Sequence, residues 1–140
     1  MAKTVLKANN ISIVFGGLKA VENFCIEIKE GELVGLIGPN GAGKTTVFNM
    51  LTGVYVPTSG TVELCGQDVT NFLPHKRVEL GISRTFQNIR LFKRMSVLEN
   101  VKVSSNIQMN YSVFDGIFKT KKYFEQEDKA TKEALEILQV

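Results

Sequence analysis

The stretch over residues 38–45 limits the folds open to this chain more than any other. It reads Gly-Pro-Asn-Gly-Ala-Gly-Lys-Thr and fits the phosphate-binding pattern G-x-x-x-x-G-K-[ST]. An apolar run over residues 33–37 precedes it, and Val47, Met50 and Leu51 share one helical face after it. We therefore expect a buried strand, a glycine-rich loop and a helix in succession, with the loop as an anion site.

The residue types in this loop suit a phosphate chain. Glycines at 38, 41 and 43 permit backbone conformations in which successive N–H groups point at one anion. The following helix adds its unpaired N–H groups and the positive end of its dipole. Lys44 supplies a charge for the β- and γ-phosphates, and the Thr45 hydroxyl is suited to Mg²⁺. The alternative is a glycine-rich turn that holds no ligand.

Composition narrows the setting without deciding the function. The 140 residues make one domain or part of one, and 44% hydrophobic with 22% charged residues is ordinary for a globular chain. A net charge of +3 fits anionic nucleotides or a membrane surface but demands neither. No apolar run approaches the ~18 residues of a membrane span. Cys25 and Cys65 lack metal spacing, so we expect reduced, half-buried thiols in a cytoplasmic protein.

The first third of the chain predicts three strands joined by tight turns. Apolar residues alternate with others over 11–15 and again over 24–28, which indicates half-exposed antiparallel strands. Residues 33–37 do not alternate, so we expect a parallel strand buried on both faces. The predicted class is therefore α/β, with an N-terminal antiparallel β layer and a partial parallel core.

Further signals outline the rest of the chain. Ser96-Val97-Leu98-Glu99 fits a capping box and predicts a helix start. From about Phe124 the pattern is amphipathic, with Ala130, Ala134 and Leu138 on one face. The other expected elements are a helix over about 44–52 ended by Gly53, short strands over 61–65 and 82–86, and a short helix from Pro74 to about Leu80. Because the chain ends inside the amphipathic pattern, we expect it to be the front part of a longer, incomplete domain.

Three stretches resemble the ATP-binding subunits of ABC transporters. They are GPNGAGKTT at 38–46, PTSG at 57–60 and RTFQNIRLFKRMSVL at 84–98. The likeness covers nearly the whole chain and is greatest to the subunits that serve branched-chain amino acid uptake, to which Phe15-Gly16-Gly17-Leu18 is also similar. It implies a P-loop NTPase fold of the ABC type. Residues from 1 to about 90 would form part of the catalytic core, and about 95–140 the start of a helical subdomain.

The resemblance also implies roles for individual residues. Phe15 matches the aromatic residue that stacks on adenine, although a core phenylalanine at a strand end is the alternative. Gln87 matches the Q-loop glutamine, which contacts Mg²⁺ and senses the permease; an ordinary loop glutamine is the alternative. Lys44 and Gln87 would then serve catalysis, and Thr45 and Gln87 the metal. The residues expected to bind ATP are Phe15, Gly38, Pro39, Asn40, Gly41, Ala42, Gly43, Lys44, Thr45 and Thr46.

The partners implied are membrane permease subunits and a second ATP-binding subunit, identical or different. The resemblance places the protein at the cytoplasmic face of the cell membrane, peripheral through the permease, and implies no nucleic acid. The basic residues over 90–94 would lie near the permease or form a plain solvated face. Tyr111, Phe114 and Phe118 are expected to pack within the helical subdomain, with a docking surface as the alternative.

Several family elements are absent from these 140 residues. The sequence has no LSGGQ signature and no apolar run followed by Asp-Glu. His75 precedes Gln87, so it does not match the family's switch histidine and is expected on a helix surface. We therefore expect ATP binding with little hydrolysis by this chain alone. A GTPase is disfavoured because N-K-x-D and D-x-x-G are missing, and a non-catalytic nucleotide-binding fragment remains open. The transported substrate rests on the resemblance alone.

Overall fold

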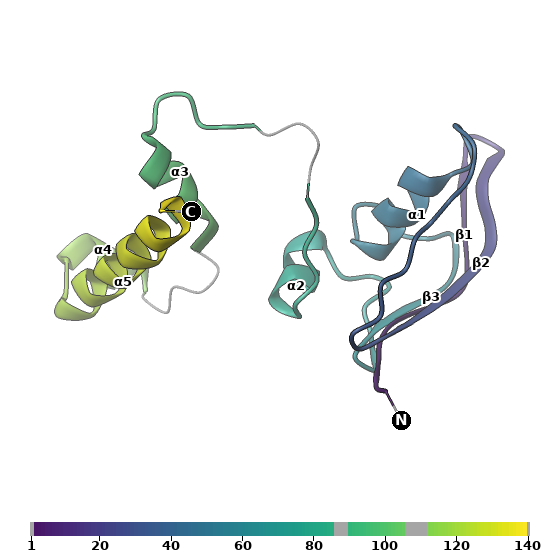
Figure 1. Cartoon of the computed structure of the whole chain (residues 1–140), viewed down its shortest axis with the longest axis horizontal. Coiled ribbons are helices and arrows are strands. Elements are labelled where there is room, and N and C mark those ends of the chain that lie inside the picture. Colours follow the sequence, from purple (N-terminus) through teal and green to yellow (C-terminus); the bar gives the residue numbers. More distant parts are fainter. Residues whose placement is uncertain (1, 86–89, 106–111, 140) are drawn as a thin grey trace. The chain divides into compact units, whose positions relative to one another are not determined.

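The computed structural model describes residues 2–85, 90–105 and 112–139. The chain divides into two compact units, Met1–Thr85 and Phe86–Val140 (Figure 1). Within these described residues, the first unit contains a sheet and two helices, and the second contains three helices. None of the helices in the described part is long and apolar enough to cross a bilayer.

The first unit is built on an antiparallel sheet with the strand order β2-β1-β3-β4. Its strands are β1 (Thr4–Phe15), β2 (Leu18–Lys29), β3 (Ser59–Leu64) and β4 (Gln67–Asp68). Gly16 and Gly17 join β1 to β2 with φ of 53° and 89°, which glycine adopts without a steric penalty. The predicted antiparallel layer is confirmed, because the alternating residues of β1 and β2 form its longest ladder.

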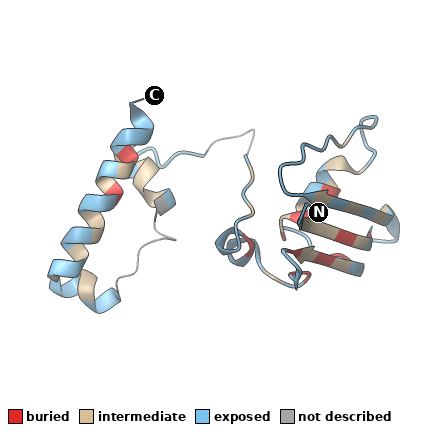
Figure 2. Ribbon diagram, turned by 60° about the horizontal axis from the view of Figure 1, so that its bottom comes forward, coloured by how far each residue is buried: buried red, intermediate tan, exposed pale blue. Residues whose placement is uncertain are grey.

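The core lies between one face of this sheet and helix α1 (Lys44–Leu51). Val47, Met50 and Leu51 of α1 are buried, as the helical spacing predicts. They share one cluster with sheet residues that include Ile11 and Val62, both 0% exposed. Figure 2 shows buried residues in red on the strands of the sheet. Each fully buried aliphatic side chain of this kind contributes about 1.5–3 kcal/mol. The predicted helix over 44–52 is confirmed: α1 ends at Leu51 with Thr52 as its C-cap, and Gly53 follows with φ of 79°.

The prediction of a buried parallel strand over residues 33–37 is wrong for this structure. Leu33 and Ile37 are 99% and 94% exposed, and all strand pairs among the described residues are antiparallel. An apolar run becomes a strand only when a neighbouring strand accepts its backbone hydrogen bonds, and no described strand pairs with this segment. Residues 82–85, in the predicted strand 82–86, also lie outside any strand for want of a partner.

An arginine at the centre of the unit was not expected from the sequence. Arg77 lies in α2 (Pro74–Glu79), which begins with Pro74 as predicted, and its side chain is 0% exposed. The guanidinium donates hydrogen bonds to four backbone carbonyls. These are Met50 O and Leu51 O at 2.8 Å, Thr70 O at 2.9 Å and Phe72 O at 3.2 Å. The first two belong to the C-terminal end of α1, where carbonyls have no partner within the helix.

Gly53 makes room for this arginine. A Cβ atom at position 53 would lie 2.8 Å from Arg77 Nε and 2.8 Å from Phe72 O. The glycine is therefore required twice, by its positive φ and by the close approach of the guanidinium.

The helical unit contains α3 (Val97–Ser105), α4 (Val113–Phe118) and α5 (Lys121–Leu138). The capping box is confirmed, because Ser96 N–H donates to Glu99 Oε2 at 2.7 Å and Glu99 N–H donates to Ser96 Oγ at 3.2 Å. The amphipathic helix is also confirmed, with Ala130 and Ala134 buried. Helix α3 packs against α5, and Lys102 Nζ lies 2.7 Å from Glu127 Oε2 between them.

The expectation of half-buried cysteines is wrong. Cys25 and Cys65 are both free and exposed. Cys25 alternates with half-buried Phe24 and Ile26, so it falls on the solvated face of β2. Cys65 occupies the turn between β3 and β4 with φ of 51°.

Replacing the buried arginine tests how much it contributes to the stability of the fold. We expect Arg77→Met to lower the free energy of unfolding by about 3 kcal/mol or more, because four carbonyls lose their donor in a buried site. Urea unfolding followed by circular dichroism measures this change. Lys76→Met is the matched control on the same helix, because Lys76 is exposed and forms an ion pair with Glu79 at the surface. The control should stay within about 0.5 kcal/mol of the parent chain. Equal losses in both variants would contradict the role of Arg77.

Candidate phosphate-binding site

The glycine-rich loop ends where α1 begins. Gly43 is the N-cap residue with φ of 80°, in the left-handed region, and the Val47 N–H donates to its carbonyl at 2.9 Å. No side chain caps this end of the helix, and no acidic residue lies in its first turn. The first N–H groups of α1 are thus left without intrahelical acceptors, which suits an anion.

A close backbone contact holds the loop against the sheet. A Cβ atom at Gly43 would lie 2.7 Å from Ala20 O and 3.1 Å from Val21 Cγ2, both in β2. Gly41 also has a positive φ, of 85°, and Ala42 N–H donates to Pro39 O at 3.2 Å. Glycine at 41 and 43 therefore serves two different needs: 41 permits the turn, and 43 also permits the close approach to β2.

The Lys44 ammonium group turns back into the loop. Its Nζ donates to Gly38 O at 2.6 Å and to Pro39 O at 2.7 Å. None of the ion pairs within the described residues involves Lys44, so its positive charge is not neutralised by a carboxylate there. The loop curves around a cation whose charge remains available to an anion.

The other predicted ligands of the loop are accessible. Asn40 and Thr45 are exposed, and Thr46 is half-buried. Beside the loop lies a hollow of about 270 Å³. It is lined by residues of β2, of the segment 36–37, of the loop and of α1, among them Val21, Phe24, Leu36, Ala42, Lys44 and Val47. Residues 38–46 thus come together around one end of α1, whereas Gln87 lies outside the described residues.

Phe15 stands at the end of β1, and its ring is 44% exposed. Its strand partner is Leu18, two residues before Ala20, whose carbonyl touches Gly43. Two residues of strand span roughly 7 Å, so Phe15 and the loop border neighbouring parts of β2. The alternative of a buried core phenylalanine does not fit this exposure.

Sequence reasoning missed a second aromatic residue at this place. The rings of Phe15 and Tyr55 meet edge to face, with centroids 5.3 Å apart and an angle of 70°. The Tyr55 N–H donates to Asn49 O of α1 at 3.0 Å, which positions the residue. No sequence pattern links Tyr55 to Phe15, because the two residues are 40 positions apart in the sequence.

Sequence reasoning also missed a contact of Arg84, which precedes Gln87 by three positions in the sequence. Arg84 Nη1 donates to Asn49 Oδ1 at 2.6 Å, and this bond is partly buried. It ties the segment that precedes Gln87 to α1, the helix that begins at the loop. Asn49 thus accepts a hydrogen bond from Tyr55 through its backbone carbonyl and one from Arg84 through its side chain.

The remaining candidates carry less chemistry. His75 is exposed on α2, where the sequence places it. Within the described part of the chain no cluster of three or more His, Cys, Asp or Glu side chains could hold a metal.

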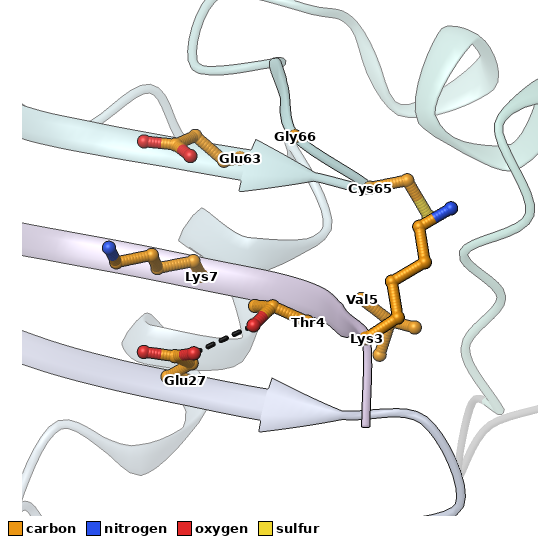
Figure 3. Close-up of a pocket in the computed structure, with 8 residues that line it drawn as sticks. All are labelled: Lys3, Thr4, Val5, Lys7, Glu27, Glu63, Cys65 and Gly66. Atoms are coloured by element: carbon orange, nitrogen blue, oxygen red, sulfur yellow. Dashed lines mark hydrogen bonds between the residues drawn. The ribbon is translucent and has the colours of Figure 1, made fainter. Parts of the chain in front are cut away.

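A hollow of about 300 Å³ on the solvated face of the sheet contains Lys7 between Glu27 and Glu63 (Figure 3). Thr4 Oγ1 donates to Glu27 Oε1 at 2.7 Å and is the main cause that lowers the pKa of Glu27. Glu27, Lys7 and Glu63 therefore form a row of alternating charges across three neighbouring strands on the solvated face of the sheet.

Together the loop, the uncapped helix and Lys44 define a P-loop nucleotide-binding fold. Residues 21–139 match the ABC transporter family, and the chain belongs to that family. The chain is 42% identical over 130 residues to the high-affinity branched-chain amino acid transport ATP-binding protein BraF of Pseudomonas aeruginosa. That match covers 93% of this chain and 51% of the relative. It is 46% identical over 120 residues to the corresponding protein LivG of Salmonella typhimurium, over 86% of this chain and 47% of that one.

Solved structures give the same fold. A nucleotide-free ATP-binding cassette from an ABC transporter superposes with a TM-score of 0.75 at 34% identity, over 97% of this chain and 53% of that one. An ATP-binding cassette in its ADP conformation superposes with a TM-score of 0.67 at 36% identity, over 84% and 46%. The predicted P-loop NTPase class of the ABC type is confirmed. The chain spans about half the length of the curated relatives it matches.

A methyl group at Gly43 tests the packing of the loop on the sheet. We expect Gly43→Ala to lower the free energy of unfolding by about 1–3 kcal/mol, because its φ is strained for alanine and the new Cβ meets Ala20 O. Gly35→Ala is the control, since Gly35 has open space around it and no positive φ. Thermal unfolding of both variants measures the difference. A Gly43→Ala variant as stable as Gly35→Ala would contradict the contact with β2.

Proposed function

We propose that this chain is the N-terminal, nucleotide-binding part of an ATP-driven importer subunit of the ABC type. The observation that carries the proposal is the uncapped start of α1, pressed onto β2 through Gly43, with the Lys44 ammonium held inside the loop. Branched-chain amino acids are the proposed cargo, because that is the transport named for BraF and LivG. The relatives support this proposal over about half their length.

The phosphate chain of ATP would bind to the loop backbone. The N–H groups at the start of α1 have no side-chain cap, so they can donate to phosphate oxygens. Lys44 would exchange one or both of its short bonds to Gly38 O and Pro39 O for bonds to the β- and γ-phosphates. Hydrogen bonds from a charged donor are the stronger kind, so we expect Lys44 to contribute strongly to phosphate binding.

The donor set also fits Mg²⁺. The exposed Thr45 hydroxyl at the start of α1 offers an oxygen ligand next to the phosphate site. Gln87 is the second proposed ligand from its match to the Q-loop, and its amide would orient water without adding charge. When bound, Mg²⁺ neutralises the charge that develops on the phosphates. Lys44 and Gln87 are the proposed catalytic residues of this chain.

Phe15 would supply the face on which adenine stacks. Its half-exposed ring leaves a surface for the base, and the edge contact with Tyr55 restricts the ring. A restricted ring loses less entropy when a ligand stacks on it. Stacking of this kind contributes about 1–3 kcal/mol per base.

Transport would need more than this chain. No signature sequence and no Asp-Glu pair follows an apolar run in these 140 residues. We therefore propose a second ATP-binding subunit to complete the nucleotide site and permease subunits to carry the cargo. The complex would lie at the cytoplasmic face of the membrane. Little hydrolysis is expected from the 140-residue chain alone.

Removing the lysine charge tests the phosphate site. We expect Lys44→Ala to weaken Mg-ATP binding by about tenfold or more, because it removes charge-assisted hydrogen bonds to phosphate. Isothermal titration calorimetry with ATP gives the affinity. Lys76→Ala, at an exposed lysine of α2, should leave the affinity unchanged and controls for total charge. Unchanged affinity in Lys44→Ala would refute the proposed site.

A second titration tests the identity of the base. We expect Phe15→Ala to weaken ATP binding by about 1–3 kcal/mol, whereas Phe15→Tyr should retain it. Inorganic triphosphate, which has no base, should bind both variants equally. A parallel titration with GTP distinguishes adenine stacking from guanine recognition. Equal losses for ATP and triphosphate would show that Phe15 supports the loop and does not contact the base.

A further inference from the structure

Helix α4 presents its apolar residues to solvent. Val113, Phe114, Ile117 and Phe118 are 77%, 72%, 69% and 74% exposed. Their spacing puts all four on one side of a helix of six residues. This contradicts the expectation that Phe114 and Phe118 pack within the helical unit; Tyr111 lies outside the described residues. We call residues 113–122 the α4 surface.

The helix is held in this orientation by its polar side. Asp115 and Gly116 are half-buried, although they are the polar and small residues of α4. Ser112 N–H donates to Asp115 Oδ2 at 2.9 Å, and Thr120 Oγ1 donates to Asp115 Oδ1 at 2.9 Å. The bonds from Ser112 and then Thr120 lower the pKa of Asp115, so its carboxylate stays ionised at neutral pH. The inverted amphipathic pattern is therefore fixed by specific hydrogen bonds.

Lysines flank the apolar residues. Lys119, Lys121 and Lys122 follow α4 directly and are exposed. Lys121 forms an ion pair with Glu125 at 3.7 Å on the surface, and such a pair contributes little to stability. Asp115 is the one carboxylate within residues 113–122, and it is already engaged by Ser112 and Thr120. The α4 surface therefore combines an exposed apolar face with an excess of positive charge.

We propose that the α4 surface rests in the interface of an anionic lipid bilayer. Short amphipathic segments with aromatic residues and lysines bind there by burying their apolar side at the boundary between headgroups and acyl chains. Each lysine near an anionic surface adds about 1 kcal/mol. The excess of exposed lysines beside the apolar side chains matches an anionic lipid surface in charge.

This proposal stands apart from nucleotide binding and can fail or succeed independently. The chain contains no tryptophan, so one introduced residue reports on its own surroundings. We would prepare Phe114→Trp in the 140-residue chain and add vesicles of phosphatidylglycerol or of phosphatidylcholine. Some vesicles would carry bromine on the acyl chains, which quenches tryptophan on contact. Phe92→Trp is the matched control, because Phe92 is a 57% exposed phenylalanine of the same unit.

The expected result is a blue shift and quenching by brominated phosphatidylglycerol in Phe114→Trp but not in Phe92→Trp. Adding Phe118→Ser should weaken vesicle binding by about tenfold, the loss expected for one aromatic side chain. Lys121→Gln should weaken it about fivefold. These positions are exposed, and circular dichroism of each variant checks that the helices remain.

Three outcomes would overturn the proposal. The first is no binding to either kind of vesicle. The second is equal binding to neutral and anionic vesicles, which would exclude a role for the lysines. The third is self-association, seen as a concentration-dependent mass by light scattering, that Phe118→Ser abolishes while vesicle binding is absent. That result would assign the α4 surface to a protein contact.

Discussion

The first unit depends on one buried cation. Arg77 carries a full charge into the interior, and burial lowers its pKa while the Asp68 carboxylate partly offsets this effect. The cost is met by four carbonyl acceptors, two of them at the end of α1. Asp68 itself accepts from Thr70, whose hydroxyl also accepts from the Val62 N–H. A single network therefore joins the β3–β4 hairpin, α2 and the C-terminal end of α1.

Because of this network, α1 is held at both ends. Its C-terminal end is tied by Arg77, and its N-terminal end is pressed onto Ala20 through Gly43. Only the start of α1 is left with unpaired N–H groups, and that is where Lys44 lies. The proposed anion site thus exists because packing satisfies the other polar groups of the helix. Asn49 of the same helix accepts hydrogen bonds from Tyr55 and Arg84, and Tyr55 lies against Phe15 at the proposed base site.

Some apolar segments of this chain are buried, whereas others are exposed to solvent. Those with a neighbour, such as the alternating residues of β1, were buried as predicted. Leu33 and Ile37 and the apolar residues of α4 are exposed, whereas Leu36, between Leu33 and Ile37 in the sequence, is half-buried against the core. Apolarity measures the free energy gained if a side chain leaves water, and the pattern does not reveal whether a covering surface exists. For α4 the local hydrogen bonds of Asp115 even turn the apolar side outward.

Features that depend on neighbouring positions could be predicted from the order of the residues. The loop over 38–45, the α1 face of Val47, Met50 and Leu51, the β1–β2 hairpin and the Ser96 capping box all follow from local spacing, and so does the family. Contacts between distant segments could be found only in the folded chain. These include the burial of Arg77, the approach of Tyr55 to Phe15 and the closeness of Gly43 to Ala20. The physical reason is that local spacing sets backbone conformation and amphipathic faces, whereas desolvation and close packing depend on which segments meet.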